Sequence, residues 1–513
     1  MKLLLDTNSI ESYQQFLRIK SLPSYRIRGH MAEFPDEYCE RLGIAVAEPD
    51  AVDYHPSEFL FDYQAAISAM AIRKRKFAAF VDPGLGKTNI YFEFARTALA
   101  AMGNERGALI ITPPMVIEQT CAEAERFYGH DFPIEIVKSG SLVKWNETCA
   151  GKIGVTNYEA FRNEIRRGQL GCLIPDESHA LASHYGKYAQ GVLDLGKGIE
   201  WKLSGTGTPA PNDRIEYANQ AVFLDHFPTV NSFLAKYFVN RGQTCERWVL
   251  KRYALQSFYQ SLSHWCIFLS DPSVYGWKDN CNTIPPINIH IHDVESTAEQ
   301  KVEVQRQTGQ LYAHRIGGIT KRSVLSKIAK GLDGTPTLKY DFILSLLNSW
   351  PEKSTIVWCW FNEEQARLAK MIPGAASIEG TTKHSDRLTL LADFQAGRRK
   401  VLISKPDVLG YGLNLQIATK QVFSSLIDSY RDFYQAVKRS NRYGSTEPLD
   451  VHIPVIEMER PMVENVLRKA KRIEEDTRQQ ELIFRAAQAG DSVDAVLQEH
   501  GIDVANLMDD LEE

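Results

Sequence analysis

Short apolar runs recur along the chain, and the segments between them have helical periodicity. The first block contains three such runs, at 77–81, 108–112 and 171–175. The second block contains three more, at 354–360, 400–404 and 422–426. Almost continuous apolar strands that alternate with helices are typical of a parallel sheet whose two faces are both covered. The sequence therefore predicts an α/β protein with two parallel-sheet lobes.

The chain has 513 residues, which is enough for two or three domains. Its alternation of strands and helices weakens between about 226 and 336, where Tyr, Trp and Phe are frequent. We expect five segments in chain order: a small N-terminal extension at 1–57, a first lobe at 58–225, a mainly helical insertion at 226–336, a second lobe at 337–460 and a charged helical tail at 461–513.

Charge and cysteine usage exclude some classes of protein. The net charge of −5 does not exclude nucleic acid, because binding needs a local basic groove and not a basic whole. The eight cysteines form no C-x2-C pair, so we expect no zinc site, no disulfide framework and a reducing cytoplasm. No run approaches the ~18 apolar residues of a membrane span, and the first apolar run is too short for a signal peptide.

A phosphate-binding loop is predicted between the first apolar run and the helix that follows it. The sequence from 81 to 88 reads Val-Asp-Pro-Gly-Leu-Gly-Lys-Thr. The backbone N–H groups around Gly84 and Gly86 can surround phosphate oxygens. Lys87 is then expected on the β- and γ-phosphates of ATP, and Thr88 on Mg²⁺. Taken alone, the pattern also fits an ordinary Gly-rich turn.

An acidic pair, Asp176 and Glu177, follows the third apolar run of the first block. Such a pair is often only a solvated strand end. Behind a phosphate loop at this spacing, however, Asp176 is expected to hold Mg²⁺ and Glu177 to orient or deprotonate the attacking water.

Two arginines lie three residues apart in the second lobe, at Arg439 and Arg442. The pattern predicts that both lie on one helix and share one face. Arginines on a helix are commonly solvated surface residues, and their role here depends on the other motifs.

Taken together, these motifs resemble those of the superfamily 2 helicases and translocases, and within them the Swi/Snf-like ATPases. The resemblance covers roughly residues 58–460. Asp62-Tyr63-Gln64 is similar to the family's glutamine motif, and Asp176–His179 reads as a DExH box with Ser178 where Ala or Gly is usual. Val81 stands where other phosphate loops have Gly, as is common in this family.

The resemblance implies roles for further residues. Gln64 is expected to read adenine, with Gly84, Gly86 and Gly412 also at the nucleotide. Six residues are expected at nucleic acid: Thr112, Pro113, Thr156, Asn157, Gly380 and Thr381. Five are expected to couple hydrolysis to movement: His179, Thr206, Thr208, Asn212 and Gln435. Catalysis is expected from Lys87, Glu177, Arg439 and Arg442, the arginines contributing cations to the transition state when two RecA-like lobes close on ATP.

The resemblance thus implies a nucleic-acid-dependent ATPase that needs ATP and Mg²⁺ and translocates on duplex DNA with little sequence preference. Two alternatives stay open: a helicase that separates strands of DNA or RNA, and the motor subunit of a restriction or defence complex. The chain's compactness resembles Swi/Snf-like proteins of phages and mobile elements.

Overall fold

The computed structural model describes all of 1–513 except 23–24, 35–37, 40–41, 45–51, 163–164, 182–186, 211–213, 243–247, 252–253, 279–283, 309–318, 410–412, 427–429, 443–444, 490–492 and 502–513. Residue contacts divide the chain into two units. The first unit comprises 1–279 and 475–513, and the second comprises 280–474.

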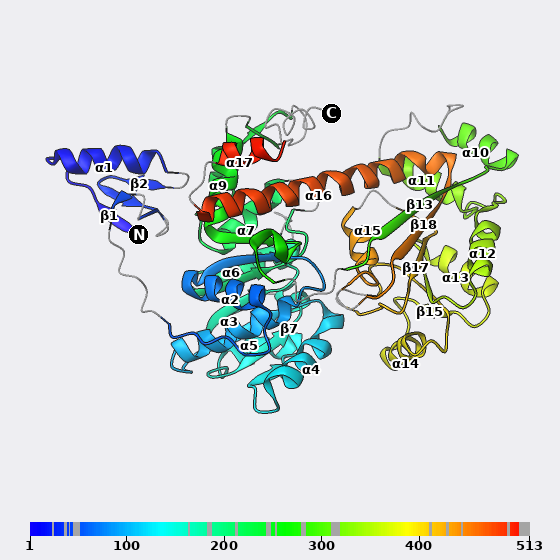
Figure 1. The fold of residues 1–513 in the computed structure, drawn as a ribbon, viewed down its shortest axis with the longest axis horizontal. Helices are drawn as coiled ribbons and strands as arrows, with labels where there is room; N and C mark the ends of the chain where they lie inside the picture. The colour runs from blue at the N-terminus through cyan, green and yellow to red at the C-terminus, as the bar shows by residue number, and fades with distance from the viewer. Residues whose placement is uncertain are drawn as a thin grey trace. The chain divides into compact units, whose positions relative to one another are not determined.

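Within the described residues, seven parallel strands form the central sheet of the first unit, in the order β12-β4-β9-β8-β5-β7-β6. Figure 1 labels β7 of this sheet and the helices around it. The strands are β4 (Lys76–Val81), β5 (Gly107–Ile111), β6 (Ile134–Ile136), β7 (Ile153–Thr156), β8 (Leu170–Pro175), β9 (Trp201–Gly205) and β12 (Cys266–Leu269). All residues of β5, β8, β9 and β12 are buried. This burial on both faces explains the almost continuous apolar runs.

The remaining elements of the first unit are mostly helices. They are α2 (Asp62–Lys74), α3 (Lys87–Ala101), α4 (Ile117–Tyr128), α5 (Leu142–Asn146), α6 (Lys187–Gly196), α7 (Tyr217–Phe223), α8 (Val230–Tyr237), α9 (Leu255–Trp265) and α17 (Val493–Glu499). A two-stranded antiparallel ribbon joins β10 (Phe238–Asn240) to β11 (Trp248–Leu250). A small three-stranded sheet near the N-terminus contains β1 (Lys2–Leu4), β2 (Arg26–Arg28) and β3 (Met31–Glu33), with α1 (Ile10–Lys20) and a core of its own.

The second unit is built on a six-stranded parallel sheet of described residues, in the order β13-β18-β17-β14-β16-β15. Its strands are β13 (Ile287–Val294), β14 (Thr355–Trp358), β15 (Ala376–Ile378), β16 (Val401–Ser404), β17 (Lys420–Phe423) and β18 (Leu449–Ile456). Its helices are α10 (Ala298–Thr308), α11 (Ile319–Ala329), α12 (Lys339–Ser349), α13 (Asn362–Met371), α14 (His384–Gln395), α15 (Tyr430–Val437) and the first half of α16 (Arg460–Ala489). The predicted fold class, two parallel-sheet lobes with helices, is confirmed.

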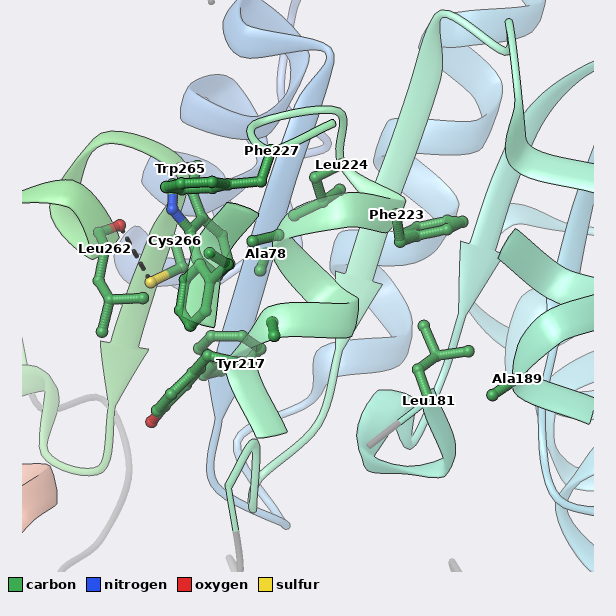
Figure 2. Packing of buried hydrophobic residues seen from close by; sticks show 14 of the residues in the cluster. Ala78, Leu181, Ala189, Tyr217, Phe223, Leu224, Phe227, Leu262, Trp265 and Cys266 are labelled. Carbon is green, nitrogen blue, oxygen red and sulfur yellow. Dashed lines mark hydrogen bonds between the residues drawn. The ribbon is translucent and has the colours of Figure 1, made fainter. Parts of the chain in front are cut away.

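The stretch 226–336 is divided between the two units. Its strand β12 pairs with β4 in the first sheet, and its strand β13 pairs with β18 in the second. Two of its aromatic residues, Phe258 and Trp265, are fully buried in the first core. Figure 2 shows Trp265 packed in this cluster beside Cys266. The division between the units falls at 279/280.

A buried ion triad joins three elements of the second unit. The Glu459 carboxylate accepts from Lys330 Nζ and Lys339 Nζ, each at 2.5 Å, and all three side chains are at most 4% exposed. Burial opposes ionisation of Glu459, but the two lysines outweigh this effect and lower its pKa. The triad ties α11 and α12 to the residue that precedes α16.

We expect Glu459→Ala to destabilise the second unit by about 3–5 kcal/mol, because it leaves two buried ammonium groups without their carboxylate. Hydrogen exchange in peptides from α11 and α12 measures this loss. The control is Lys353→Ala, which removes an exposed pair with Glu447 and is expected to cost under ~1 kcal/mol. Equal protection in the two variants would contradict the prediction.

Candidate active site

The predicted site residues of the first unit gather at the carboxyl ends of neighbouring parallel strands. The phosphate loop follows β4, Thr112 follows β5, Asp176 follows β8 and Thr206 follows β9. The two strands end in register, since Asp176, directly after β8, forms a parallel bridge with Gly205, the last residue of β9. Ligands of α/β sheets bind at this edge.

The loop after β4 has the backbone that its glycines allow. Gly84 and Gly86 have φ values of +97° and +72°, and α3 begins directly afterwards at Lys87. A Cβ on Gly86 would lie 2.3 Å from Gln64 Nε2, so no larger residue fits there without a shift. Lys87 Nζ donates to the carbonyl of Val81 at 2.8 Å, across the loop. Lys87 and Thr88 thus open a helix whose first N–H groups face the loop.

Gln64 lies behind this loop and is 2% exposed. Its Nε2 donates to the carbonyls of Leu85, at 3.1 Å, and Gly86, at 3.3 Å. Its Oε1 accepts from the backbone N–H of Phe61 at the start of α2. In this structure the side chain therefore fixes the phosphate loop, while the reading of adenine by Gln64 stays a prediction.

Asp176 is held by hydroxyl groups from three elements. Tyr91 Oη donates to Oδ1 at 2.9 Å, and Thr112 Oγ1 donates to Oδ2 at 3.0 Å. Tyr158 Oη donates to the backbone carbonyl of Asp176 at 2.5 Å. Burial, and then the charge of Glu177, raise the pKa of Asp176. The carboxylate is thus fixed in place. A cation bound beside it would stabilise its ionised form.

Glu177 has a backbone φ of +50°, in the left-handed region that non-glycine residues seldom adopt. Strained backbone of this kind is frequent at functional sites. Its Oε2 accepts from Thr206 Oγ1 at 3.1 Å and lies 3.3 Å from His179 Nδ1. Burial opposes ionisation, but the contact with His179, the positive charge of Lys87 and the hydrogen bond from Thr206 outweigh it and lower the pKa of Glu177. Glu177 is therefore an ionised, oriented carboxylate.

Three of the predicted coupling residues form one buried cluster with Glu177. His179 Nδ1 lies 3.3 Å from Thr206 Oγ1, and the Thr208 backbone N–H donates to the same oxygen at 3.1 Å. The segment after β9 is thereby connected directly to Glu177. Asn212, predicted beside this cluster, lies outside the described residues.

The oxygen ligands at this edge suit Mg²⁺. The cation prefers oxygen, and proteins commonly bind it through one or two carboxylates together with substrate phosphates. Asp176 offers a partly buried carboxylate, and Thr88 offers a hydroxyl at the second position of α3. These residues therefore fit the predicted role.

The residues predicted at nucleic acid in the first unit are largely buried. Thr112 and Thr156 are at most 1% exposed, and the Thr112 N–H donates to the Thr156 carbonyl at 2.8 Å. Pro113 is buried, whereas Asn157 is partly exposed. Contacts with a ligand at this position would therefore come from backbone and from Asn157, and not from the two threonine hydroxyls.

In the second unit, Gly380 and Thr381 follow β15 on an exposed turn. A Cβ on Gly380 would meet open space. The turn is closed by Thr382, whose Oγ1 accepts from the N–H of Glu379 at 2.8 Å. Gly412 lies outside the described residues.

Arg439 and Arg442 do not lie on a helix, contrary to the sequence-based prediction. Helix α15 ends at Val437. The Arg439 N–H bonds to Ala436, three residues back, and the Arg439 carbonyl accepts from Leu415 N–H, which draws the backbone out of the helix. Arg439 is 2% exposed, Arg442 is partly buried with Nε donating to the Lys438 carbonyl, and Gln435 is 6% exposed on α15. Helical spacing therefore does not relate the two arginines.

Sequence reasoning missed the groups that support the acidic pair. Tyr91 and Tyr158 hold Asp176, and Gln220 binds the hydroxyl of Ser178. All three are separated from their partners by at least 18 residues along the chain. The only signal for this network in the sequence was Ser178, where this family usually has Ala or Gly.

Comparisons with known proteins bear on both lobes. The family model described as type III restriction enzyme, res subunit, matches residues 59–209. The family model described as helicase conserved C-terminal domain matches 338–444. The chain belongs to the superfamily 2 helicases and translocases. As a member of this superfamily it is an ATP-hydrolysing enzyme, a nucleic-acid-dependent ATPase motor.

Some solved structures are distantly similar to this chain. The Sulfolobus solfataricus SWI2/SNF2 ATPase core in complex with dsDNA is 16% identical, with a TM-score of 0.38 over 87% of this chain and 97% of that one. S. cerevisiae Dbp5 bound to RNA and ADP BeF3 is 11% identical, with a TM-score of 0.49 over 82% and 94%. Because these TM-scores are below 0.5, the assignment rests on the two family models. No curated protein matches the chain.

None of the helices in the described ranges combines the length and the apolar character needed to span a bilayer.

Proposed function

We propose that this superfamily 2 enzyme is an ATP-driven translocase on double-stranded DNA. The observation that carries the proposal is the connection of Glu177 to Thr206. An oriented carboxylate beside the phosphate loop is bonded to the segment that the Swi/Snf-like resemblance assigns to coupling. Hydrolysis and a change of conformation would thus share one hydrogen-bonded cluster.

Each group at this edge has a distinct task in the proposed reaction. Lys87 and the backbone of the loop would bind the β- and γ-phosphates, and Asp176 with Thr88 would hold Mg²⁺, which would supply charge neutralisation of the phosphates. Glu177 orients the attacking water and accepts its proton. Tyr91 and Thr112 keep Asp176 in one orientation. Phosphoryl transfer depends mainly on such positioning.

Nucleic acid is proposed to contact the exposed turn at Gly380 and Thr381 and the strand ends at Pro113 and Asn157. Backbone groups and small polar side chains at these positions suit phosphates better than base edges. The proposal therefore includes little sequence preference and a strong dependence on salt. Preference for duplex DNA rests on two sequence motifs of the second lobe, at 379–382 and 410–414, which resemble those of Swi/Snf-like ATPases. The origin in a phage or mobile element stays a prediction.

We expect duplex DNA to raise steady-state ATP turnover by about tenfold or more, which corresponds to a barrier lowered by at least ~1.4 kcal/mol. Single-stranded DNA and RNA are expected to raise turnover less. Raising salt from 50 to 200 mM should weaken DNA binding and so steeply raise the DNA concentration needed for half-maximal stimulation. Glu177→Gln is the control, which should bind ATP and remain inactive on every nucleic acid. Turnover that is independent of nucleic acid would contradict the motor proposal.

A second assay separates translocation from strand separation. A translocase displaces a third strand from a triplex without opening the duplex beneath it. A helicase releases a strand from a partial duplex instead, and this outcome would favour the alternative reading. Stimulation by RNA alone would assign the protein to another branch of the superfamily.

A further inference from the structure

A single buried amide connects three segments of the candidate site. Gln220 lies on α7 and is 0% exposed. Its Oε1 accepts from Ser178 Oγ at 3.0 Å and from Ser204 Oγ at 3.1 Å. Its Nε2 donates to the carbonyl of Pro209 at 3.0 Å.

The chemistry of these partners determines the orientation of the amide. The carbonyl of Pro209 can only accept, so it requires the amide NH₂ group, and the amide oxygen then faces two hydroxyls that can donate to it. The opposite orientation would place the amide oxygen against the Pro209 carbonyl, so only one arrangement satisfies all three contacts. Neither an apolar residue nor a carboxylate makes all three hydrogen bonds.

The positions of these partners along the chain connect Gln220 to catalysis. Ser178 directly follows Glu177, whose backbone is in the left-handed region. Ser204 and Pro209 lie on either side of Thr206, which donates to the Glu177 carboxylate. Gln220 thus restrains the backbone next to Glu177 and both ends of the segment that contains its partner.

Helix α7 is itself firmly anchored. Tyr217 and Phe223, near its two ends, are at most 3% exposed in the hydrophobic core. Figure 2 shows both side chains within the cluster that includes Ala78 of β4. Asn219, adjacent to Gln220, donates from Nδ2 to the carbonyl of Leu181 at 2.5 Å. The helix therefore also holds the far end of the short 3-10 turn that begins at Ser178.

We propose that Gln220 is a positioning residue that keeps Glu177 and Thr206 in one register, so that the carboxylate is aligned with the attacking water. The inference rests on the proposed function of Glu177 and deepens it, because it identifies what holds that carboxylate in place. Gln220 acts through its hydrogen bonds with Ser178 and Ser204. A displacement of about 1 Å at a reacting group is enough to slow a reaction by about 100-fold.

The test is the kinetics of Gln220→Leu in the full-length protein. We expect kcat per folded molecule to fall about 10- to 100-fold, while KM for ATP changes less than about threefold, because positioning affects the chemical step more than binding. Ser178→Ala removes one hydroxyl only and is expected to lower kcat about fivefold, the effect of one net hydrogen bond. In the double variant, kcat should be no lower than in Gln220→Leu alone, because the groups act as one unit.

The matched control is Gln365→Leu, in α13 of the second unit. Gln365 is also fully buried, and its Nε2 donates to Ser377 Oγ and to the carbonyls of Ile378 and Ile403. This variant shows how loss of a buried glutamine alone affects thermal stability and turnover. The inference is overturned if Gln220→Leu and Ser178→Ala keep kcat within twofold of wild type, or if Gln365→Leu lowers kcat as much as Gln220→Leu does.

Wild-type turnover, measured with and without nucleic acid, distinguishes failure of this inference from failure of the proposed function. If nucleic acid does not stimulate wild-type turnover, the motor proposal fails, and the kcat ratios measured with ATP alone still decide the role of Gln220. If nucleic acid stimulates the wild type and the Gln220 and Ser178 variants turn over normally, only the positioning role is lost.

Discussion

Replacing Lys87 with alanine is expected to lower ATP turnover by about 10³-fold or more, which corresponds to ~4 kcal/mol of barrier. Lys87 is the first residue of α3, and its ammonium group lies across the loop, 2.8 Å from the Val81 carbonyl. In that position it is proposed to neutralise charge on the transferred phosphoryl group. The backbone of the loop would still surround the phosphates, but without a side-chain cation.

Steady-state turnover and ATP affinity, measured in parallel, test this prediction. Lys87→Met is the first companion variant, since it keeps most of the aliphatic stem and removes the charge. Lys197→Ala is the control lysine: its side chain is 76% exposed and forms an ion pair with Asp194 on α6. If Lys87 served only to close the loop, its loss would cost about 1 kcal/mol of stability and leave turnover intact. That outcome would end the assignment of the phosphate loop.

Alanine at Arg442 is expected to reduce turnover by about 10³–10⁵-fold with little change in ATP or DNA binding, if the arginine acts on transition-state charge as the resemblance implies. Lysine at the same position should restore little, because a point charge does not reproduce the planar guanidinium. Arg442 is the sharper of the two tests, since its side chain is only partly buried.

Arg439→Ala is expected to have a similar kinetic effect and an additional effect on folding. Its side chain is 2% exposed, so the kinetics must be normalised to the folded fraction by circular dichroism. Arg398→Ala is the matched control in the same unit, because this arginine is 63% exposed and pairs with Asp393. Wild-type turnover in both the Arg439 and Arg442 variants would exclude a catalytic role for these arginines.

The fold class followed from local features of the sequence. The run at 77–81 became β4, and the run at 400–404 became β16, because strands buried on both faces need apolar residues at every position. The phosphate loop was equally local, since Gly84 and Gly86 set its backbone directly. The acidic pair was recognisable because it follows a strand at a fixed edge of the sheet.

Pairings between distant segments were not visible in the same way. Parallel strands need no turn between them, so nothing near Cys266–Leu269 marked it as the neighbour of β4, and nothing near Ile287–Val294 marked it as the neighbour of β18. The early end of α15 likewise involves a distant residue, because the Leu415 N–H donates a hydrogen bond to the Arg439 carbonyl.

The sequence by itself determined which residues are proposed to carry the chemistry: the loop lysine, the acidic pair and the cations of the second lobe have distinctive types and spacings. Only the tertiary structure decided what holds them. It assigned the Thr112 hydroxyl to Asp176, brought Tyr91 to the same carboxylate across 85 residues and joined Ser178 to Ser204 through Gln220. The physical reason is that a hydroxyl or an amide has no preferred partner along the chain. Its hydrogen bonds are chosen only when folding buries it beside a group that needs one.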